Sequence, residues 1–183
     1  MNNINYVKKL TRASMLLVFA FIIIFTGSRI GGAVFNSFVV GPLVNAVILI
    51  TVMITDIKFG ALVGFSTPIL AALTGQLAAP MVPFVPFVMA GNITLAVVFG
   101  ILNKYVKTYG SYFGIAAGAI LKTLVLVFSA KYLISIFNLN IPKPIVSKLV
   151  ILMSYPQLYS AIAGGILALI VYSIFKRTYN ENL

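Results

Sequence analysis

The sequence predicts an all-α integral membrane protein with six transmembrane helices. Hydrophobic residues make up 61% of the 183 residues and charged residues only 8%, and the mean hydropathy is +1.11, values that exclude an ordinary soluble domain. Apolar stretches long enough to cross a hydrocarbon core of about 30 Å recur along the chain, joined by short polar or proline-rich connections. We therefore expect a single membrane domain over residues 1–183.

The first half of the chain holds three of these spans. A basic head at residues 1–12 resembles the start of a signal peptide, but the apolar run after it has no convincing small-residue cleavage site and is taken as a span. Gly27-Ser-Arg-Ile-Gly-Gly predicts a flexible connection, and residues 55–60 predict a tight turn. The predicted bounds are Leu10–Ser28, Val34–Thr55 and Phe59–Ala78.

Prolines and polar turns delimit the other spans. Pro68, near the middle of the third span, is predicted to kink the helix and free a backbone carbonyl, which is tolerated where a neighbour or a cavity bonds that carbonyl again. Pro80, Pro83 and Pro86 predict a short, stiff re-entry, and residues 138–144 predict a polar turn. The predicted bounds are Phe84–Leu102, Tyr112–Phe137 and a sixth span that starts between Lys148 and Gln157 and ends near Phe175.

The distribution of positive charge predicts that both termini are cytoplasmic. Six spans put both termini on one side, where eight basic residues flank the spans: Lys8, Lys9, Arg12, Lys58, Lys104, Lys107, Lys176 and Arg177. The other side has three: Arg29, Lys143 and Lys148. Cytoplasmic loops carry the excess of Lys and Arg, so the net charge of +11 is explained without a nucleic-acid partner.

Missing residue types exclude several classes of function. The chain has no Cys and no His, so thiol catalysis, haem ligation and ordinary zinc sites lack their main ligands, and a serine nucleophile lacks its usual base. Its two acidic residues, Asp56 and Glu181, fall at segment ends, so no span holds the carboxylate of a proton- or sodium-coupled transporter. We expect no catalytic residue, no cofactor and no metal, and an energy source on another subunit if the chain moves a solute uphill.

Two lysines inside the fifth span are the strongest functional signal. Lys122 falls near mid-bilayer, and Lys131 follows nine residues later, half a turn out of phase. A charge at that depth costs at least about 2.5–3.5 kcal/mol on insertion scales and normally faces the bundle interior, a water-filled cavity or a partner. Without a carboxylate nearby, Lys122 must be neutral, bonded to carbonyls and amides, snorkelling, or open to an anion from outside.

Other polar side chains gather in the predicted outer halves of the spans. Together they predict a ligand cavity that is open to the outside and lined by aromatic side chains. Its amides and cations would bind a small polar ligand, most simply an anion such as a carboxylate. The candidate substrate-binding residues are Arg29, Asn36, Gln76, Asn92, Lys122, Lys131, Tyr155, Gln157 and Tyr159.

Several candidates have a structural alternative. Arg29 is more often an interfacial anchor, Lys131 and the two tyrosines are more often snorkelling or aromatic-belt residues, and Asn92 equally fits helix packing. Asn45 and Ser66 are expected to bond neighbouring helices rather than substrate. Small-residue patterns, Phe59-Gly-x-x-x-Gly64, Phe113-Gly-x-x-x-Gly118 and the set Ala161, Gly164, Gly165 and Ala168, predict close helix packing and do not establish a duplication.

Nearly the whole chain resembles the substrate-binding S components of energy-coupling factor (ECF) vitamin transporters. The resemblance rests on size, six spans, a basic head and three patterns: Phe59-Gly-Ala-Leu-Val-Gly-Phe-Ser-Thr-Pro, Pro83-Phe-Val-Pro-Phe, and Gly91-Asn92 leading into Val98-Phe-Gly-Ile-Leu. It implies a bacterial plasma-membrane protein that captures a vitamin-like ligand at its outer face. It also implies docking on a transmembrane coupling subunit with two ATPases, and toppling in the membrane to release the ligand.

The first helix departs from the family pattern. The family often carries Ala-x-x-x-Ala there as the docking face for the coupling subunit, whereas this chain has Leu17 in place of the second alanine. Ala13 and Ser14 remain as the predicted docking residues.

Two other classes of function stay open at this point. Unpaired lysines also line anion or small-solute channels, although the nearly aliphatic cytoplasmic halves of several spans argue against a through-pore. A non-transporting scaffold would use the small-residue faces but leaves the deep lysine unexplained. The ligand is not named by the sequence: pantothenate, biotin, lipoate and nicotinate all suit a positive site with amides, and thiamine-like cations suit it badly.

Overall fold

The computed structural model describes residues 3–77, 79–137, 139 and 141–181, and every regular element in these residues is helical. Two π-turns and one 3₁₀ segment interrupt the α-helices. In chain order the elements are α1 (Asn3–Ile30), α2 (Ala33–Phe35), a π-turn (Asn36–Val40), α3 (Gly41–Ile54), α4 (Ile57–Leu73), a 3₁₀ segment (Ala79–Phe84), α5 (Val85–Tyr105), α6 (Gly110–Phe128), a π-turn (Ser129–Leu133), α7 (Ile134–Ile136), α8 (Lys143–Leu152) and α9 (Tyr155–Glu181).

Five helical segments of the described chain are long and apolar enough to cross a membrane. They are Asn3–Ile30, Asn36–Ile54, Ala79–Tyr105, Gly110–Ile136 and Lys143–Arg177. The remaining predicted span corresponds to α4, which has only 17 residues. At 1.5 Å per residue α4 is about 26 Å long, at the lower limit for a spanning helix.

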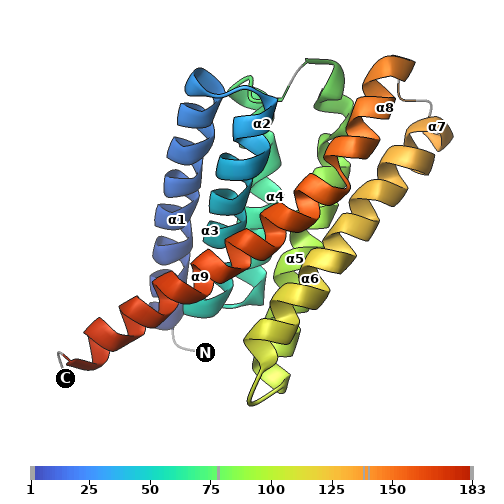
Figure 1. The fold of residues 1–183 in the computed structure, drawn as a ribbon. Coiled ribbons are helices and arrows are strands. Elements are labelled where there is room, and N and C mark those ends of the chain that lie inside the picture. Colours follow the sequence, from blue (N-terminus) through green and yellow to red (C-terminus); the bar gives the residue numbers. More distant parts are fainter. Residues whose placement is uncertain (1–2, 78, 138, 140, 182–183) are drawn as a thin grey trace.

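The long helices run alternately up and down, so both ends of the chain lie at the same end of the molecule (Figure 1). The most extensive contacts are those of α5 with α6, α3 with α9 and α4 with α5. Because α6 also contacts α9, and α3 contacts α4, these five helices close into a ring. Helix α1 packs outside the ring, against α3 and α4.

Some predicted boundaries need correction. The flexible connection expected from Gly27 is wrong at its start, because α1 continues to Ile30 and only Gly31 and Gly32 separate it from α2. Gly27 is buried, and a Cβ there would meet Val40, so this glycine allows a close helix contact. The last helix, α9, begins at Tyr155, within the predicted range, but a separate helix that was not predicted, α8, precedes it and extends the apolar segment back to Lys143. Ala78 and the turn residues Asn138 and Asn140 lie outside the described residues.

The proline inside α4 behaves as predicted with respect to hydrogen bonding. Pro68 has no N–H to give to the carbonyl four residues earlier, that of Gly64. Asn92 Nδ2, from α5, donates to that oxygen at 3.3 Å, and Thr67 Oγ1 donates to it at 3.3 Å. A neighbouring helix therefore satisfies the carbonyl that the proline frees.

At the end that carries the termini, Asp56 joins α1 to the turn between α3 and α4. Its carboxylate caps α4 by accepting from the backbone N–H groups of Lys58 and Phe59, at 3.0 and 3.2 Å. The same side chain pairs with Lys9 of α1 at 3.2 Å. The pair is partly exposed, so its role is to align α1 rather than to add much stability.

Three apolar clusters fill the described interior. The largest lies in the half near the termini and contains Ile48, Leu49, Leu95 and Phe99. Two smaller clusters lie toward the opposite end, one with Phe84, Leu126 and Leu149 and one with Ile24, Val40 and Ala71.

The predicted small-residue faces do pack helices closely. Gly60, Gly64, Gly114, Gly118, Gly164 and Gly165 are all buried. Among these six glycines the closest approach to a neighbouring backbone is at Gly164 of α9, where an added Cβ would lie 2.5 Å from the carbonyl oxygen of Pro42 and 2.7 Å from Asn45 Cβ on α3.

Replacing Gly164 by alanine should therefore separate α3 from α9. The methyl group would meet rigid backbone, so we expect Gly164→Ala to lower the free energy of unfolding by about 1–3 kcal/mol, measured as a lower melting temperature in detergent. Gly32→Ala is the matched control, because no heavy atom lies within 4 Å of a Cβ at that position. Equal melting temperatures for the two variants would contradict the close contact.

Candidate functional site

A pocket of about 450 Å³ opens at the end of the molecule opposite the termini. That volume is typical of a site for a small molecule. Segments far apart in the chain contribute to it: the end of α1 and its turn, the first π-turn, α3 to α6, and the junction of α8 and α9. The described lining consists of Ile24, Gly31, Gly32, Asn36, Ser37, Val40, Gly41, Val44, Asn45, Thr67, Pro68, Ala71, Gly75, Gln76, Leu77, Met81, Val88, Asn92, Lys122, Leu152, Met153, Gln157 and Ser160.

Lys122 lies at the floor of this pocket, with 2% of its surface exposed. Its Nζ donates to Asn45 Oδ1 at 2.7 Å, and Asn45 Nδ2 donates to Ser160 Oγ at 2.9 Å. The chain of bonds joins α6, α3 and α9. Of the two acidic residues, Asp56 is engaged with Lys9, and the side chain of Glu181 is outside the described part. Among described residues, then, no carboxylate balances the buried amine.

Asn92 forms part of the wall through which α5 meets α4. Its Nδ2 donates to the Gly64 carbonyl and to Thr67 Oγ1, at 3.3 and 3.2 Å, while its Oδ1 has no hydrogen bond of its own among the described residues. An added Cβ on Gly64 would lie 3.2 Å from the Asn92 backbone, so glycine lets the two helices come this close. The Asn92 side chain thus joins α5 to α4 through Nδ2, and its Oδ1 remains available as a hydrogen-bond acceptor in the pocket.

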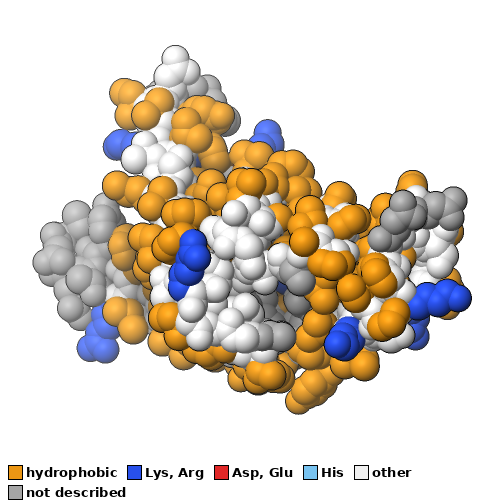
Figure 2. All heavy atoms as spheres, turned by 90° about the horizontal axis from the view of Figure 1, so that it is seen from above, with side chains coloured by type: hydrophobic (Ala, Val, Ile, Leu, Met, Phe, Trp, Pro, Cys, Tyr) orange, Lys and Arg blue, Asp and Glu red, His pale blue; other side chains and the backbone are white. Residues whose placement is uncertain are grey.

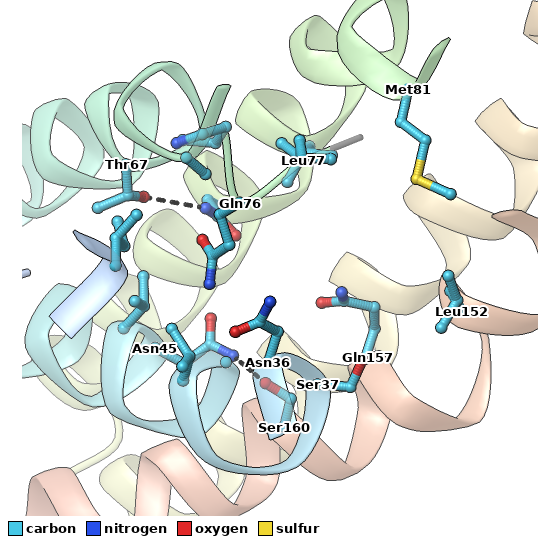
Figure 3. Close-up of a pocket in the computed structure, with 18 of the residues that line it drawn as sticks. Asn36, Ser37, Asn45, Thr67, Gln76, Leu77, Met81, Leu152, Gln157 and Ser160 are labelled. Carbon is cyan, nitrogen blue, oxygen red and sulfur yellow. Dashed lines mark hydrogen bonds between the residues drawn. The ribbon is translucent and has the colours of Figure 1, made fainter. Parts of the chain in front are cut away.

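Three carboxamides surround the space above the floor. Asn36 comes from the first π-turn, Gln76 from the turn after α4 and Gln157 from the first turn of α9. Figure 3 shows these side chains, with Asn45, converging on one region. Asn36 Oδ1 is buried and has no hydrogen-bond partner among the described residues, a situation that costs about 1–3 kcal/mol. Carboxamides both donate and accept, so this layer suits a polar, uncharged group.

Five of the nine predicted substrate-binding residues meet at this pocket: Asn36, Gln76, Asn92, Lys122 and Gln157. The described lining does not include Arg29, Lys131, Tyr155 or Tyr159. Arg29 is exposed and lies over the Phe25 ring, 5.1 Å from its centroid. Lys131 is exposed on the second π-turn. The positions favour the anchoring alternative for both residues.

Helical phase explains why the tyrosines fall elsewhere. Tyr155 and Tyr159 are 70% and 42% exposed, and Tyr159 packs on Phe38 with ring centroids 5.2 Å apart. Each is two residues from Gln157, which is about 200° around a helix, so they cannot share its face. The expectation of an aromatic-lined cavity is wrong for the described lining.

Sequence reasoning also missed four polar residues of the lining: Ser37, Asn45, Thr67 and Ser160. For Ser160 a signal was available, because it follows Gln157 by three residues and therefore lies on the same helical face. Asn45 does bond neighbouring helices, as expected, but it does so at the pocket floor. Ser66, expected to bond a neighbouring helix, bonds the Leu62 carbonyl of its own helix and no other described residue.

The predicted docking residues on α1 face different ways. Ala13 is 6% exposed and Ser14 is exposed. Ala13, Ala20 and Gly27 recur every seven residues and are all buried, so this small-residue face packs on the protein's own helices. Of the predicted pair, therefore, only Ser14 lies on the outer surface.

Viewed from the pocket end, apolar side chains cover most of the periphery, and Lys and Arg side chains stand at isolated points with no acidic side chain in view (Figure 2). Among described residues, no cluster of three or more potential metal ligands is present. The arrangement offers a cation and uncharged hydrogen-bonding groups. It is therefore suited to binding an anion, whereas making or breaking a covalent bond would need catalytic groups that the described lining does not offer.

A family model for "ECF transporter, substrate-specific component" matches residues 8–175, which is nearly the whole chain. Searches of curated proteins and of solved structures found no match to this chain.

The bond between Lys122 and Asn45 can be tested by a double-mutant cycle. Asn45→Leu removes the acceptor and leaves a buried amine without a partner, so the single variant should lose stability. In the Asn45→Leu/Lys122→Met protein both partners are apolar, and the combined loss should be smaller than the sum by about 1.5–3 kcal/mol. Unfolding followed in detergent measures the cycle. Strict additivity would show that the two side chains do not interact.

Proposed function

The chain belongs to the family of ECF transporter substrate-specific components, and we propose that it captures a small anionic vitamin or related micronutrient. As a member of this family it is a multi-pass membrane protein and a non-catalytic, substrate-binding subunit. Capture takes place in the pocket at the end opposite the termini. The termini face the cytoplasm and the pocket faces outward, in keeping with the excess of Lys and Arg beside the terminal ends of the spans.

The observation that carries this proposal is the unbalanced amine of Lys122. An amine so deep in a membrane protein is costly unless it is paired or solvated. Asn45 supplies one acceptor, whereas an ammonium group has three donors. An anion that enters the pocket supplies the opposite charge together with further acceptors, and the low-polarity surroundings strengthen that attraction.

The layering of the described core supports capture over conduction. Helices α3 and α5 run toward the end that carries the termini (Figure 1). By their positions along these helices, Ile48, Leu49, Leu95 and Phe99 therefore come below Asn45 and Asn92. These side chains belong to one buried apolar cluster, which closes the floor of the pocket. An anion channel would need polar groups to continue through this region.

The partners follow from the family. We assign the energy for uptake to a transmembrane coupling subunit with two ATPases, on which this subunit docks, because the chain lacks the carboxylate relay of a self-driven transporter. Ser14, on the outer surface of α1, remains a candidate contact for the coupling subunit. Ala13 is available to such a partner only if α1 shifts.

Mass spectrometry of small molecules that copurify with the protein in mild detergent tests the capture function directly. We expect one anionic compound in roughly stoichiometric amount, retained without any ATPase subunit. A protein that purifies empty and fails to bind any vitamin-like anion added back would count against capture.

Lys122→Met tests the role of the amine. Loss of a charge-assisted hydrogen bond worth about 1.5–3 kcal/mol should weaken ligand binding by about 10- to 150-fold, measured by isothermal titration, while the protein stays folded. Lys131→Met is the matched control: it removes a lysine from the same predicted span, but that lysine is exposed and outside the described lining. Equal affinities for wild type and Lys122→Met would refute the assigned role.

A further inference from the structure

The chain is rich in aromatic residues, with 14 Phe and 9 Tyr, yet none of them appears in the described lining of the pocket. Phe84 and Phe99 are fully buried in apolar clusters. Tyr155 and Tyr159 lie beside the pocket in sequence but face away from it. The apolar wall is instead made of branched aliphatic and methionine side chains, among them Val88, Leu77, Met81 and Leu152.

This composition bears on the kind of ligand that the pocket can select. Flat rings gain attraction from well-oriented aromatic side chains beyond the area that they bury, and organic cations are attracted to aromatic faces. The described lining offers neither contact. Aliphatic and thioether side chains adapt instead to a flexible chain or a saturated ring.

The polar groups divide the pocket into two levels. At the floor, Lys122 is the single cationic side chain of the described lining, and Asn45 already takes one of its donors. One cation balances one negative charge, which matches a carboxylate better than a phosphate carrying about −1.5 to −2. Above the floor, Asn36, Gln76 and Gln157 converge (Figure 3), and their amides pair with an amide or hydroxyl group rather than with a second charge.

We infer that the pocket selects an aliphatic carboxylate that carries an amide or hydroxyl group along its chain or ring, and that it discriminates against flat aromatic heterocycles. The inference rests on the proposed capture function. The carboxylate lies at the Lys122 end, the amide or hydroxyl group lies level with the three carboxamides, and the aliphatic part packs on Leu77, Met81 and Leu152.

A panel of vitamins tests the selection. Binding to the full chain in detergent is measured by isothermal titration for pantothenate and biotin, which are aliphatic acids with amide-like groups, and for lipoate, an aliphatic acid without one. Nicotinate and riboflavin represent the aromatic class, and pantothenol lacks only the carboxylate of pantothenate. We expect pantothenate or biotin to bind at least tenfold more tightly than either aromatic compound, and pantothenol to bind more weakly than pantothenate.

Two variants examine the upper level. Gln157→Leu should weaken binding of whichever amide-bearing acid binds by about tenfold, the loss expected for about 1.4 kcal/mol, and should leave lipoate binding unchanged. Tyr155→Leu, two residues away and exposed, is the matched control with no effect on either ligand.

The possible outcomes distinguish the inferred ligand class from the proposed capture function. If an aromatic compound binds most tightly and loses affinity in Lys122→Met, the ligand class inferred here is overturned while anion capture stands. Equal loss of lipoate and amide-bearing ligands in Gln157→Leu would overturn the role given to the carboxamides. If every compound fails to bind and nothing copurifies with the protein, the capture function itself fails, and this inference fails with it.

Discussion

The hydrogen bond from Lys122 Nζ to Asn45 Oδ1 governs how the pocket end of the molecule is built. A buried amine in a membrane protein needs an acceptor, and this one is supplied from a different helix, 77 positions away in the chain. Asn45 is held in turn by Ser160 of α9. The chain of bonds requires α3, α6 and α9 to stay close together. Gly164 permits this on one side, because any larger residue would push against Pro42 and Asn45.

A second irregularity serves the same end of the molecule. Pro68 leaves the Gly64 carbonyl without its helical partner, and Asn92 Nδ2 of α5 donates a hydrogen bond to it. The proline therefore permits a bond between α4 and α5. The π-turn at Asn36–Val40 likewise interrupts the helix that runs into α3 and brings Asn36 to the pocket. Backbone irregularity inside a membrane protein is tolerated where protein or a cavity satisfies it, and π-turns are frequent at functional sites. Among the described residues, the π-turns and the 3₁₀ segment therefore interrupt the helices toward the pocket end.

Depth along each span could be predicted from the sequence, but direction around each helix only in part. Hydropathy predicts the helical segments, Pro68 predicts a backbone carbonyl without its helical partner, and the deep lysine Lys122 indicates a cavity. Tyr155 and Tyr159 were assigned to the pocket by depth, although two-residue spacing places them about 200° from Gln157. Lys131 lies within a π-turn, which shifts helical phase in a way that no local composition signals. Asn45 was expected to bond helices, and only the tertiary arrangement reveals that it does so through Lys122.

The apolar floor also constrains how a captured ligand could leave. Opening a path downward through Leu49, Leu95 and Phe99 would separate helices that glycines hold in close contact, at the cost of buried apolar surface. Movement of the whole subunit leaves that packing intact and carries the mouth of the pocket with it. Such a movement needs a partner that binds the outer surface and supplies energy, because the described lining holds no carboxylate with which to couple release to protons or sodium. The packing of the core therefore favours the division of labour that the family implies: recognition on this chain, and work on the subunits that it docks with.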